Sequence, residues 1–305
     1  MTWPTGIIID TVFIPLYVAF ALLNLLNVVK HGFKRTVGFI SLLLVSLVHL
    51  VGNVILVVEY TKHDKASINV TVWGYILQSV GLSFLVSASL AFFARARAEM
   101  HDRAGQDALT GKGVKLLNLV NLAALVCVIT GYTDTNFTDA QGNVLTKVSL
   151  PTQAVVGAVL YVVLVVVILA LALAGLRGTR AAGTNETHTI RIALIVALPL
   201  MLVRAAWSVY TTKAGSILVP KSIWAKLVLQ YISELAALAV LTALGFLISR
   251  AETIETELDI EQVHSHESTK FVSQPGSGEQ SLAYQQPLQT AQQPISYSSY
   301  PPRPQ

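Results

Sequence analysis

The sequence is poor in cysteine and in charge. Its single cysteine, Cys127, excludes an intramolecular disulfide, and only 12% of the 305 residues are charged. About a quarter of the residues in a typical soluble domain are charged, whereas here 53% are hydrophobic. The composition therefore excludes an ordinary soluble protein and predicts an integral membrane protein.

Motifs for binding phosphate or metal are also missing. The segment Gly105–Gly113 resembles a phosphate loop, but its spacing is one residue too long, and Gly113 stands where Ser or Thr should hold magnesium. The seven histidines show no zinc-site spacing, and no aspartate-rich run could chelate the magnesium of a prenyl diphosphate. We expect no metal, no cofactor and, with the net charge of +4 confined mostly to loops, no nucleic-acid partner.

Long apolar runs dominate what the sequence does contain. A membrane-spanning α-helix needs about 20 such residues, and seven runs qualify: Ile7–Val29, Thr36–Val58, Val72–Ala94, Val114–Tyr132, Thr152–Leu176, Ile190–Tyr210 and Ser222–Ser249. They lack the alternation of membrane β-strands. The predicted fold class is therefore all-α, a seven-transmembrane-helix bundle of residues 1–250. An acidic helical extension at 251–264 and a disordered cytoplasmic tail at 265–305 are expected to follow it.

The distribution of lysine and arginine between the two sides predicts the orientation. With the N-terminus outside or luminal and the C-terminus cytoplasmic, twelve of these residues lie on the cytoplasmic side and six on the other. The six are Lys62, Lys65, Lys147, Lys213, Lys221 and Lys226. Glycosylation sequons at Asn69 and Asn136 then face the lumen, whereas the sequon at Asn185 faces the cytoplasm. We expect the endoplasmic reticulum or another endomembrane.

Ionisable side chains inside the runs lie toward the predicted luminal face. A charge at mid-bilayer costs about 2.5 to 3.5 kcal/mol, so such residues usually point into the bundle and often carry function. Arg204 and Glu234 lie at similar depths on neighbouring helices, which predicts an ion pair whose role, structural or functional, stays open. Glu59 ends a polar stripe that includes His49 and Asn53 at helical spacing, and this stripe should face the bundle.

Aromatic and amide side chains cluster at the same level. Most of the aromatic residues are expected to form an interfacial belt. Trp207 and Tyr231 share helix faces with the two buried charges and are predicted to line a cavity. Further candidates for binding a substrate are Trp73, Gln78 and Gln230. Asp10 is expected first as a helix-start residue at the interface, and its alternative is a place among the substrate-binding residues of the cavity.

A cavity of this composition suits several functions. A carboxylic acid in an apolar surround can stay protonated and donate its proton, aromatic faces stabilise positive charge, and dryness protects a carbocation from water. These are the needs of protonation-initiated terpene cyclisation. A lipid or sterol translocator also needs a polar cleft in this place, and a receptor needs a ligand pocket there. The residues alone leave the three open.

The segment LPLMLVRAAWSVY at Leu198–Tyr210, together with the Glu234-bearing last helix and the low-complexity tail, resembles a fungal seven-helix family of unknown function. The resemblance covers residues 1 to 255. It extends to the membrane-bound terpene cyclases of fungal meroterpenoid pathways, of the ascofuranone and macrophorin cyclase type, and implies ring closure of a prenyl chain after protonation of its terminal epoxide. A more distant likeness, carried by Arg204–Trp207, is to fungal lipid-translocating exporters associated with aminocholesterol resistance.

We therefore predict a metal-independent intramembrane terpene cyclase that takes a hydrophobic substrate from the bilayer. Glu59 or Glu234 is predicted to be the general acid, with the other as base or structural partner and Arg204 orienting Glu234. A tight Arg204–Glu234 pair would favour Glu59 as the donor. Three aromatic residues are predicted to stabilise cations: Trp73, Trp207 and Tyr231. Membrane lipid and enzymes of the same pathway are the expected partners, and the alternatives are a translocator and then a receptor.

Overall fold

The computed structural model describes residues 5–31, 37–62, 67–104, 109–137, 148, 150–178, 185–214 and 222–248. All regular structure in these residues is helical, and seven helices are long and apolar enough to cross a membrane. The predicted fold class is confirmed, and the chain is an integral membrane protein. The acidic extension expected at 251–264 and the tail at 265–305 lie outside the described residues. The orientation of the termini stays a prediction.

The helices follow the apolar runs of the sequence. The first six are α1 Thr5–His31, α2 Val37–Thr61, α3 Ile68–Ala104, α4 Leu109–Thr133, α5 Thr152–Gly178 and α6 Asn185–Ala214. The last span, Ile223–Ile248, begins as α7 Ile223–Lys226, continues as the π-helical segment η3 Leu227–Ile232, and then resumes α-helical geometry. The sequence predicted a regular helix here, so the π-helical segment is unexpected.

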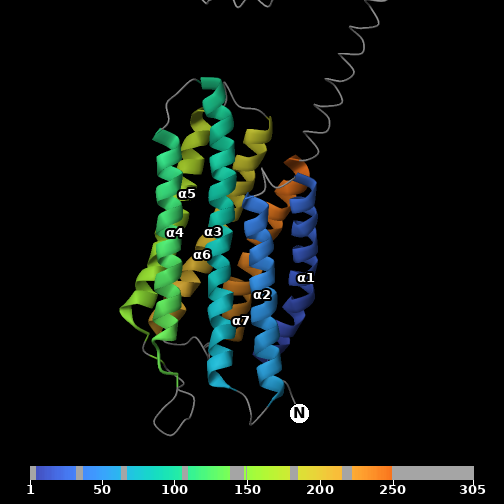
Figure 1. The fold of residues 1–305 in the computed structure, drawn as a ribbon, viewed down its shortest axis with the longest axis vertical. Coiled ribbons are helices and arrows are strands. Elements are labelled where there is room, and N and C mark those ends of the chain that lie inside the picture. Colours follow the sequence, from blue (N-terminus) through green and yellow to red (C-terminus); the bar gives the residue numbers. More distant parts are fainter. Residues whose placement is uncertain are drawn as a thin grey trace, which may run out of the picture. The chain divides into compact units, whose positions relative to one another are not determined.

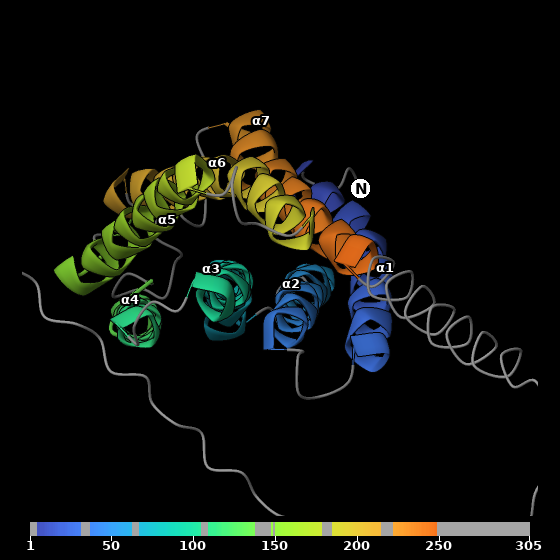
Figure 2. The same cartoon turned by 90° about the horizontal axis from the view of Figure 1, so that it is seen from above.

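Seven antiparallel spans form two layers (Figures 1 and 2). Helices α1 to α4 stand in one row, and α5, α6 and the last span pack across them. Helix α3 contacts α2, α4, α5 and α6, and more of it is buried than of any other described span. Helix α3 is therefore the centre of the bundle, and polar side chains that face it are shielded from lipid.

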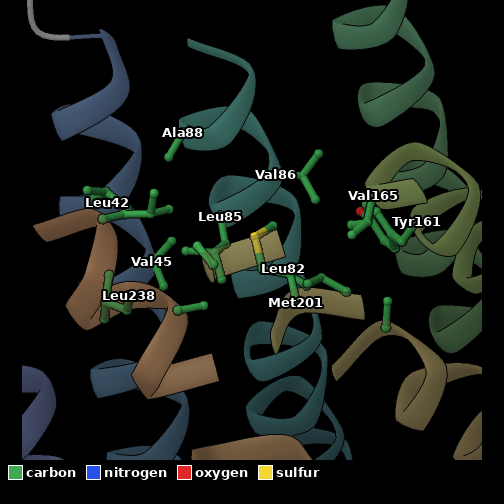
Figure 3. Close-up of a cluster of buried hydrophobic side chains, with 14 of the residues drawn as sticks. Leu42, Val45, Leu82, Leu85, Val86, Ala88, Tyr161, Val165, Met201 and Leu238 are labelled. Atoms are coloured by element: carbon green, nitrogen blue, oxygen red, sulfur yellow. The ribbon is translucent and has the colours of Figure 1, made fainter. Parts of the chain in front are cut away.

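Apolar side chains fill the middle of the bundle. Figure 3 shows Leu42 and Val45 of α2, Leu85 of α3, Met201 of α6 and Leu238 of the last span in this layer, and all five are buried. The outward faces are apolar as well, as a lipid-facing surface requires. Exposed examples are Leu22, Leu26, Val29, Leu119, Val163 and Val166.

Glycine lets α2 and α3 approach closely beside the polar layer. A Cβ added to Gly52 of α2 would lie 3.1 Å from the main-chain oxygen of Gly74 in α3, and one added to Gly74 would lie 2.9 Å from Leu56. Small residues bring membrane helices together in this way. The close contact holds the polar stripe of α2 against α3.

Candidate functional site

Three buried charged or polar groups meet at Glu234. Its Oε2 accepts a hydrogen bond from Nε of Arg204 at 2.9 Å, and its Oε1 lies 2.6 Å from Nε2 of His49. All three side chains are almost completely buried. The predicted Arg204–Glu234 ion pair is confirmed, and His49 from the polar stripe of α2 is its third member. We call these residues the Glu234 triad.

His49 is held in place by neighbours that the sequence did not reveal. Gly81 of α3 faces the imidazole so closely that an added Cβ would lie 2.1 Å from Nε2. On another side the ring of Tyr17 stacks on His49, with 4.8 Å between ring centroids and 9° between the planes. Gly81 on α3 therefore leaves room for the imidazole, and the Tyr17 ring on α1 packs against it. Together they hold His49 beside Glu234.

A second buried network links α1, α2, α3 and the last span. The Tyr231 hydroxyl donates a hydrogen bond to Oδ1 of Asp10. Nε2 of Gln78 lies 2.9 Å from the Tyr231 hydroxyl and donates to Oδ1 of Asn53 at 2.7 Å. Asp10 thus faces the bundle interior and is not an interfacial helix-start residue. Nη2 of Arg204 reaches the main-chain oxygen of Gln78 at 3.4 Å and joins this network to the triad.

A small pocket of about 30 Å³ lies beside the second network, between α3, α4, α6 and the last span. Arg204, Trp207, Gln78 and Gln230, all predicted site residues, line it. The indole nitrogen of Trp207 donates to Oε1 of Gln230 at 3.3 Å, and Nε2 of Gln230 donates to Oε1 of Gln78 at 3.3 Å. Hydrogen bonds therefore connect Trp207, Gln230 and Gln78 along one wall of the pocket.

Lys226 lines the same pocket, although the sequence indicated only that it lies on the luminal side, near the start of the last apolar run. Its side chain is buried, with 7% of the residue exposed. Nζ lies 5.2 Å from the ring centroid of Tyr75 and 5.4 Å from that of Tyr231.

The π-helical segment explains how the last span presents several polar groups together. Its wider turn accommodates an additional residue, so the adjacent Gln230 and Tyr231 both reach the interior.

Glu59 is not part of this site. It is buried at the end of α2, where Oε1 pairs with Nζ of Lys62 at 2.5 Å and Oε2 accepts from the main-chain nitrogen of Ser67 at 2.8 Å. His49 lies on the same helix almost three turns earlier, roughly 15 Å along the axis at 1.5 Å per residue. The prediction that Glu59 converges with Glu234 is therefore wrong. Through these contacts, Glu59 links the end of α2 to Ser67, the residue before α3.

Trp73 is also outside the pocket. It lies on α3 with 49% of its surface exposed, whereas the pocket is lined on that helix by Tyr75, Gln78 and Ser79. The helical repeat turns Trp73 away from these residues. Its predicted place in the cavity is wrong, and it belongs with the aromatic side chains on the outer surface.

Polar groups continue along α1 toward the opposite end of the bundle. Thr242 donates from its hydroxyl to Oδ1 of Asn24 at 3.1 Å, and Nδ2 of Asn27 donates to the main-chain oxygen of Thr242 at 3.2 Å. Nε2 of His31 lies 3.0 Å from the main-chain oxygen of Gly245. We call Asn24, Asn27, Thr242 and His31 the distal polar cluster. The sequence did not reveal it, because each residue stands singly in an apolar run.

The described part of the chain contains no group of three His, Cys, Asp or Glu side chains that could hold a metal ion. The polar groups that converge are instead paired with one another by hydrogen bonds and one ion pair.

Fold and site together define a polytopic membrane protein with a buried polar site near the end of the bundle where α1 begins. The model of a family described as a domain of unknown function, DUF7702, matches residues 5–251, which cover every described span. The chain belongs to this family. Comparison with curated proteins and with solved structures gives no match.

Proposed function

We propose that the chain is an integral membrane terpene cyclase of fungal secondary metabolism that closes rings on a prenylated, meroterpenoid-type precursor after protonating it. The observation that carries the proposal is the buried Asp10–Tyr231 pair, which Gln78 links to the pocket. Among the buried carboxyl groups of the described spans, those of Glu59 and Glu234 form ion pairs and that of Asp10 does not. Asp10 can therefore hold a proton without breaking an ion pair.

The general acid is then Asp10, and not Glu59 or Glu234 as the sequence predicted. Glu234 faces a guanidinium group that stays positively charged at any working pH, and its protonation would leave Arg204 unpaired in the interior. Glu59 lies too far along α2 from the pocket network. The Glu234 triad then positions the pocket wall. Glu234 orients Arg204, which contacts the main-chain oxygen of Gln78 and lines the pocket.

The reaction needs one proton at its start and releases one at its end. When Asp10 is protonated, its hydrogen bond with Tyr231 runs in the opposite direction from that in the structure. Asp10 then donates to the Tyr231 oxygen, and the Tyr231 hydroxyl turns so that its proton passes to the terminal epoxide oxygen of the substrate. The carbon–oxygen bond breaks, a prenyl double bond attacks the carbon that becomes cationic, and the last cation loses a proton that returns to Asp10 through Tyr231. The faces of Trp207 and Tyr231 stabilise the positive charge by cation–π interaction.

The pocket must open for this chemistry. Its volume is about 30 Å³, whereas pockets for drug-sized ligands measure about 300 to 1,000 Å³. A prenyl chain therefore binds only if the last span moves away from α3 and α6. The π-helical segment lies in that part of the last span, and such segments are frequent at functional sites.

The proposal is tested with microsomes from a fungal host that has no cyclase of its own, given a panel of epoxy-prenylated phenols and aromatic acids. Asp10→Asn keeps the shape of the side chain but removes the transferable proton. General acid catalysis contributes about 10² to 10⁴ in rate, so product formation should fall by that factor. Glu59→Gln is the matched control and should retain the parental rate. Equal rates for Asp10→Asn and the parent, or no product from any substrate in the panel, would contradict the proposal.

A lipid or sterol translocator is a second candidate, favoured by the distal polar cluster. Asp10 and His31 lie roughly 31 Å apart along α1 at 1.5 Å per residue, which is about the thickness of the hydrocarbon core. A cyclase with its pocket at one end needs no polar groups at the other end, whereas a translocation path does. Proteoliposomes with a fluorescent lipid in one leaflet test this reading. A translocator moves the lipid without changing its structure, and Asn24→Leu should slow that movement.

A further inference from the structure

We infer that the pocket between α3, α6 and the last span binds the carboxylate head group of an amphiphile, with Lys226 as the anchor. The inference goes beyond the proposed function, because it concerns an anionic amphiphile whose head group fills the closed pocket and not the prenyl chain whose epoxide reacts there. Binding itself requires no turnover, so the two proposals can fail separately.

Among the residues that the structure describes, no anionic group is paired with the buried cation of Lys226. None of the ion pairs or hydrogen bonds between described residues involves its ammonium group, whose contacts are with the faces of Tyr75 and Tyr231. Buried charges in proteins are normally paired, and charges within membrane spans mark substrate or ion sites. Lys226 lies inside the candidate span Ile223–Ile248. The missing partner is therefore an anion that enters the pocket.

The charge of the pocket selects a carboxylate. Arg204 also lines the pocket, but Glu234 neutralises it at 2.9 Å. The pocket wall therefore has one uncompensated positive charge, that of Lys226. A carboxylate brings one negative charge and balances it. A phosphate monoester carries about −1.5 to −2 at neutral pH, and it would leave excess negative charge beside the Tyr75 and Tyr231 rings.

The size of the pocket selects a head group and not a whole molecule. A volume of about 30 Å³ is larger than the roughly 10 to 15 Å³ that a cavity needs to hold one water molecule, and it has room for the two oxygens of a carboxylate. No ring or prenyl chain fits in this space. The apolar part of the ligand must therefore extend beyond the pocket toward lipid, which favours an amphiphile over a small free anion.

Quenching of Trp207 fluorescence tests the site directly. The chain has four tryptophans, and replacing Trp3, Trp73 and Trp224 by Phe leaves Trp207 in the pocket wall as the single reporter. The protein is placed in nanodiscs of zwitterionic phosphatidylcholine and titrated with 2-bromohexadecanoate, whose bromine lies next to the carboxylate. Methyl 2-bromohexadecanoate has the same bromine and chain but no charge, so it measures quenching by ligand dissolved in the bilayer.

The acid should quench Trp207 saturably, and the ester should not. Loss of a charge-assisted contact should weaken apparent affinity in Lys226→Gln by roughly tenfold or more, whereas Lys226→Arg should bind. Lys213→Gln is the matched control, because Lys213 is exposed near the end of α6. Excess acetate should not displace the brominated acid, and hexadecyl phosphate should displace it less well than hexadecanoate.

Equal quenching by acid and ester would overturn the inference, and this comparison needs no variant at position 226. Unchanged affinity of Lys226→Gln for the brominated acid would also overturn the inference. Displacement of that acid by an equal concentration of acetate would do the same. If the acid binds but no substrate is cyclised, the cyclase proposal fails and the head-group site stands. If cyclisation occurs and acid and ester bind alike, only the head-group site fails.

Discussion

Nε2 of His49 lies 2.6 Å from Oε1 of Glu234, while Arg204 occupies the other carboxylate oxygen at 2.9 Å. These two contacts tie α2 and α6 to the last span inside the bundle. Each partner comes from a different helix, so the triad can form only when all three spans are assembled. The pocket and the Asp10–Tyr231 pair lie around it, and their geometry depends on this junction.

Removing one member of the triad should destabilise the protein strongly. In Arg204→Met the carboxylate of Glu234 loses its ion-pair partner in the interior, and a broken buried pair costs about 3 to 5 kcal/mol. The free energy of unfolding is measured by denaturant titration in detergent micelles. The double variant Arg204→Met/Glu234→Leu should be less destabilised than the sum of the two single variants, because no unpaired charge remains. Strict additivity would contradict the assigned coupling.

Gly81→Ala should displace His49. The added Cβ would lie 2.1 Å from Nε2, so the imidazole must move away from Glu234 or α3 must shift from α2. Gly113→Ala is the matched control, since a Cβ there meets nothing within 4 Å, and replacing glycine in a helix stabilises by about 0.5 to 1 kcal/mol. Thermal unfolding in micelles should therefore show opposite shifts for the two variants. A tolerated Gly81→Ala would mean that His49 is not fixed as described.

Tyr231→Phe removes one hydroxyl from the second network. Asp10 loses its donor and Gln78 loses one acceptor, and a buried polar group left without a partner costs about 1 to 3 kcal/mol. Tyr210→Phe serves as the comparison, because Tyr210 is half exposed on α6. Unfolding in micelles should be easier for the first variant and unchanged for the second. Equal stability of the two variants would argue against the buried Tyr231 contacts.

Glycosylation can establish the orientation of the bundle. Asn69 lies exposed in the first turn of α3 and Asn136 lies exposed after α4, both at the end where α1 begins. In the predicted topology this end is luminal, so endoglycosidase treatment should shift the mobility of the protein on a gel. Asn69→Gln with Asn136→Gln should abolish the shift, and Asn185→Gln should not affect it. A shift that depends on Asn185 alone would invert the topology.

The level of a residue along the bundle could be predicted well from the sequence, because each residue of a helix adds 1.5 Å along the axis. This is why Arg204 and Glu234 were paired correctly. Direction around the axis was less predictable. Trp73 was expected inside and lies outside, whereas Asp10 was expected first at the interface and lies inside.

Convergence between helices was the least predictable property. Glu59 shares the polar stripe of His49, yet only His49 reaches Glu234, because the two lie almost three turns apart and only one is level with the triad. Lys226 was counted only as a positive charge on the luminal side, and it lies in the pocket. No residue pattern marked the π-helical segment that contains Gln230 and Tyr231.

The sequence by itself determined the membrane class, the seven spans and the level at which the charges lie, because crossing a bilayer requires long apolar helices that satisfy their own backbone hydrogen bonds. The tertiary structure decided which polar groups meet. In a span that is apolar nearly all round, the face turned to the protein is selected by packing against its neighbours, through contacts such as Gly81 against His49 and Gly52 against Gly74. Those contacts join residues far apart in the chain, and the local sequence of either helix does not specify them.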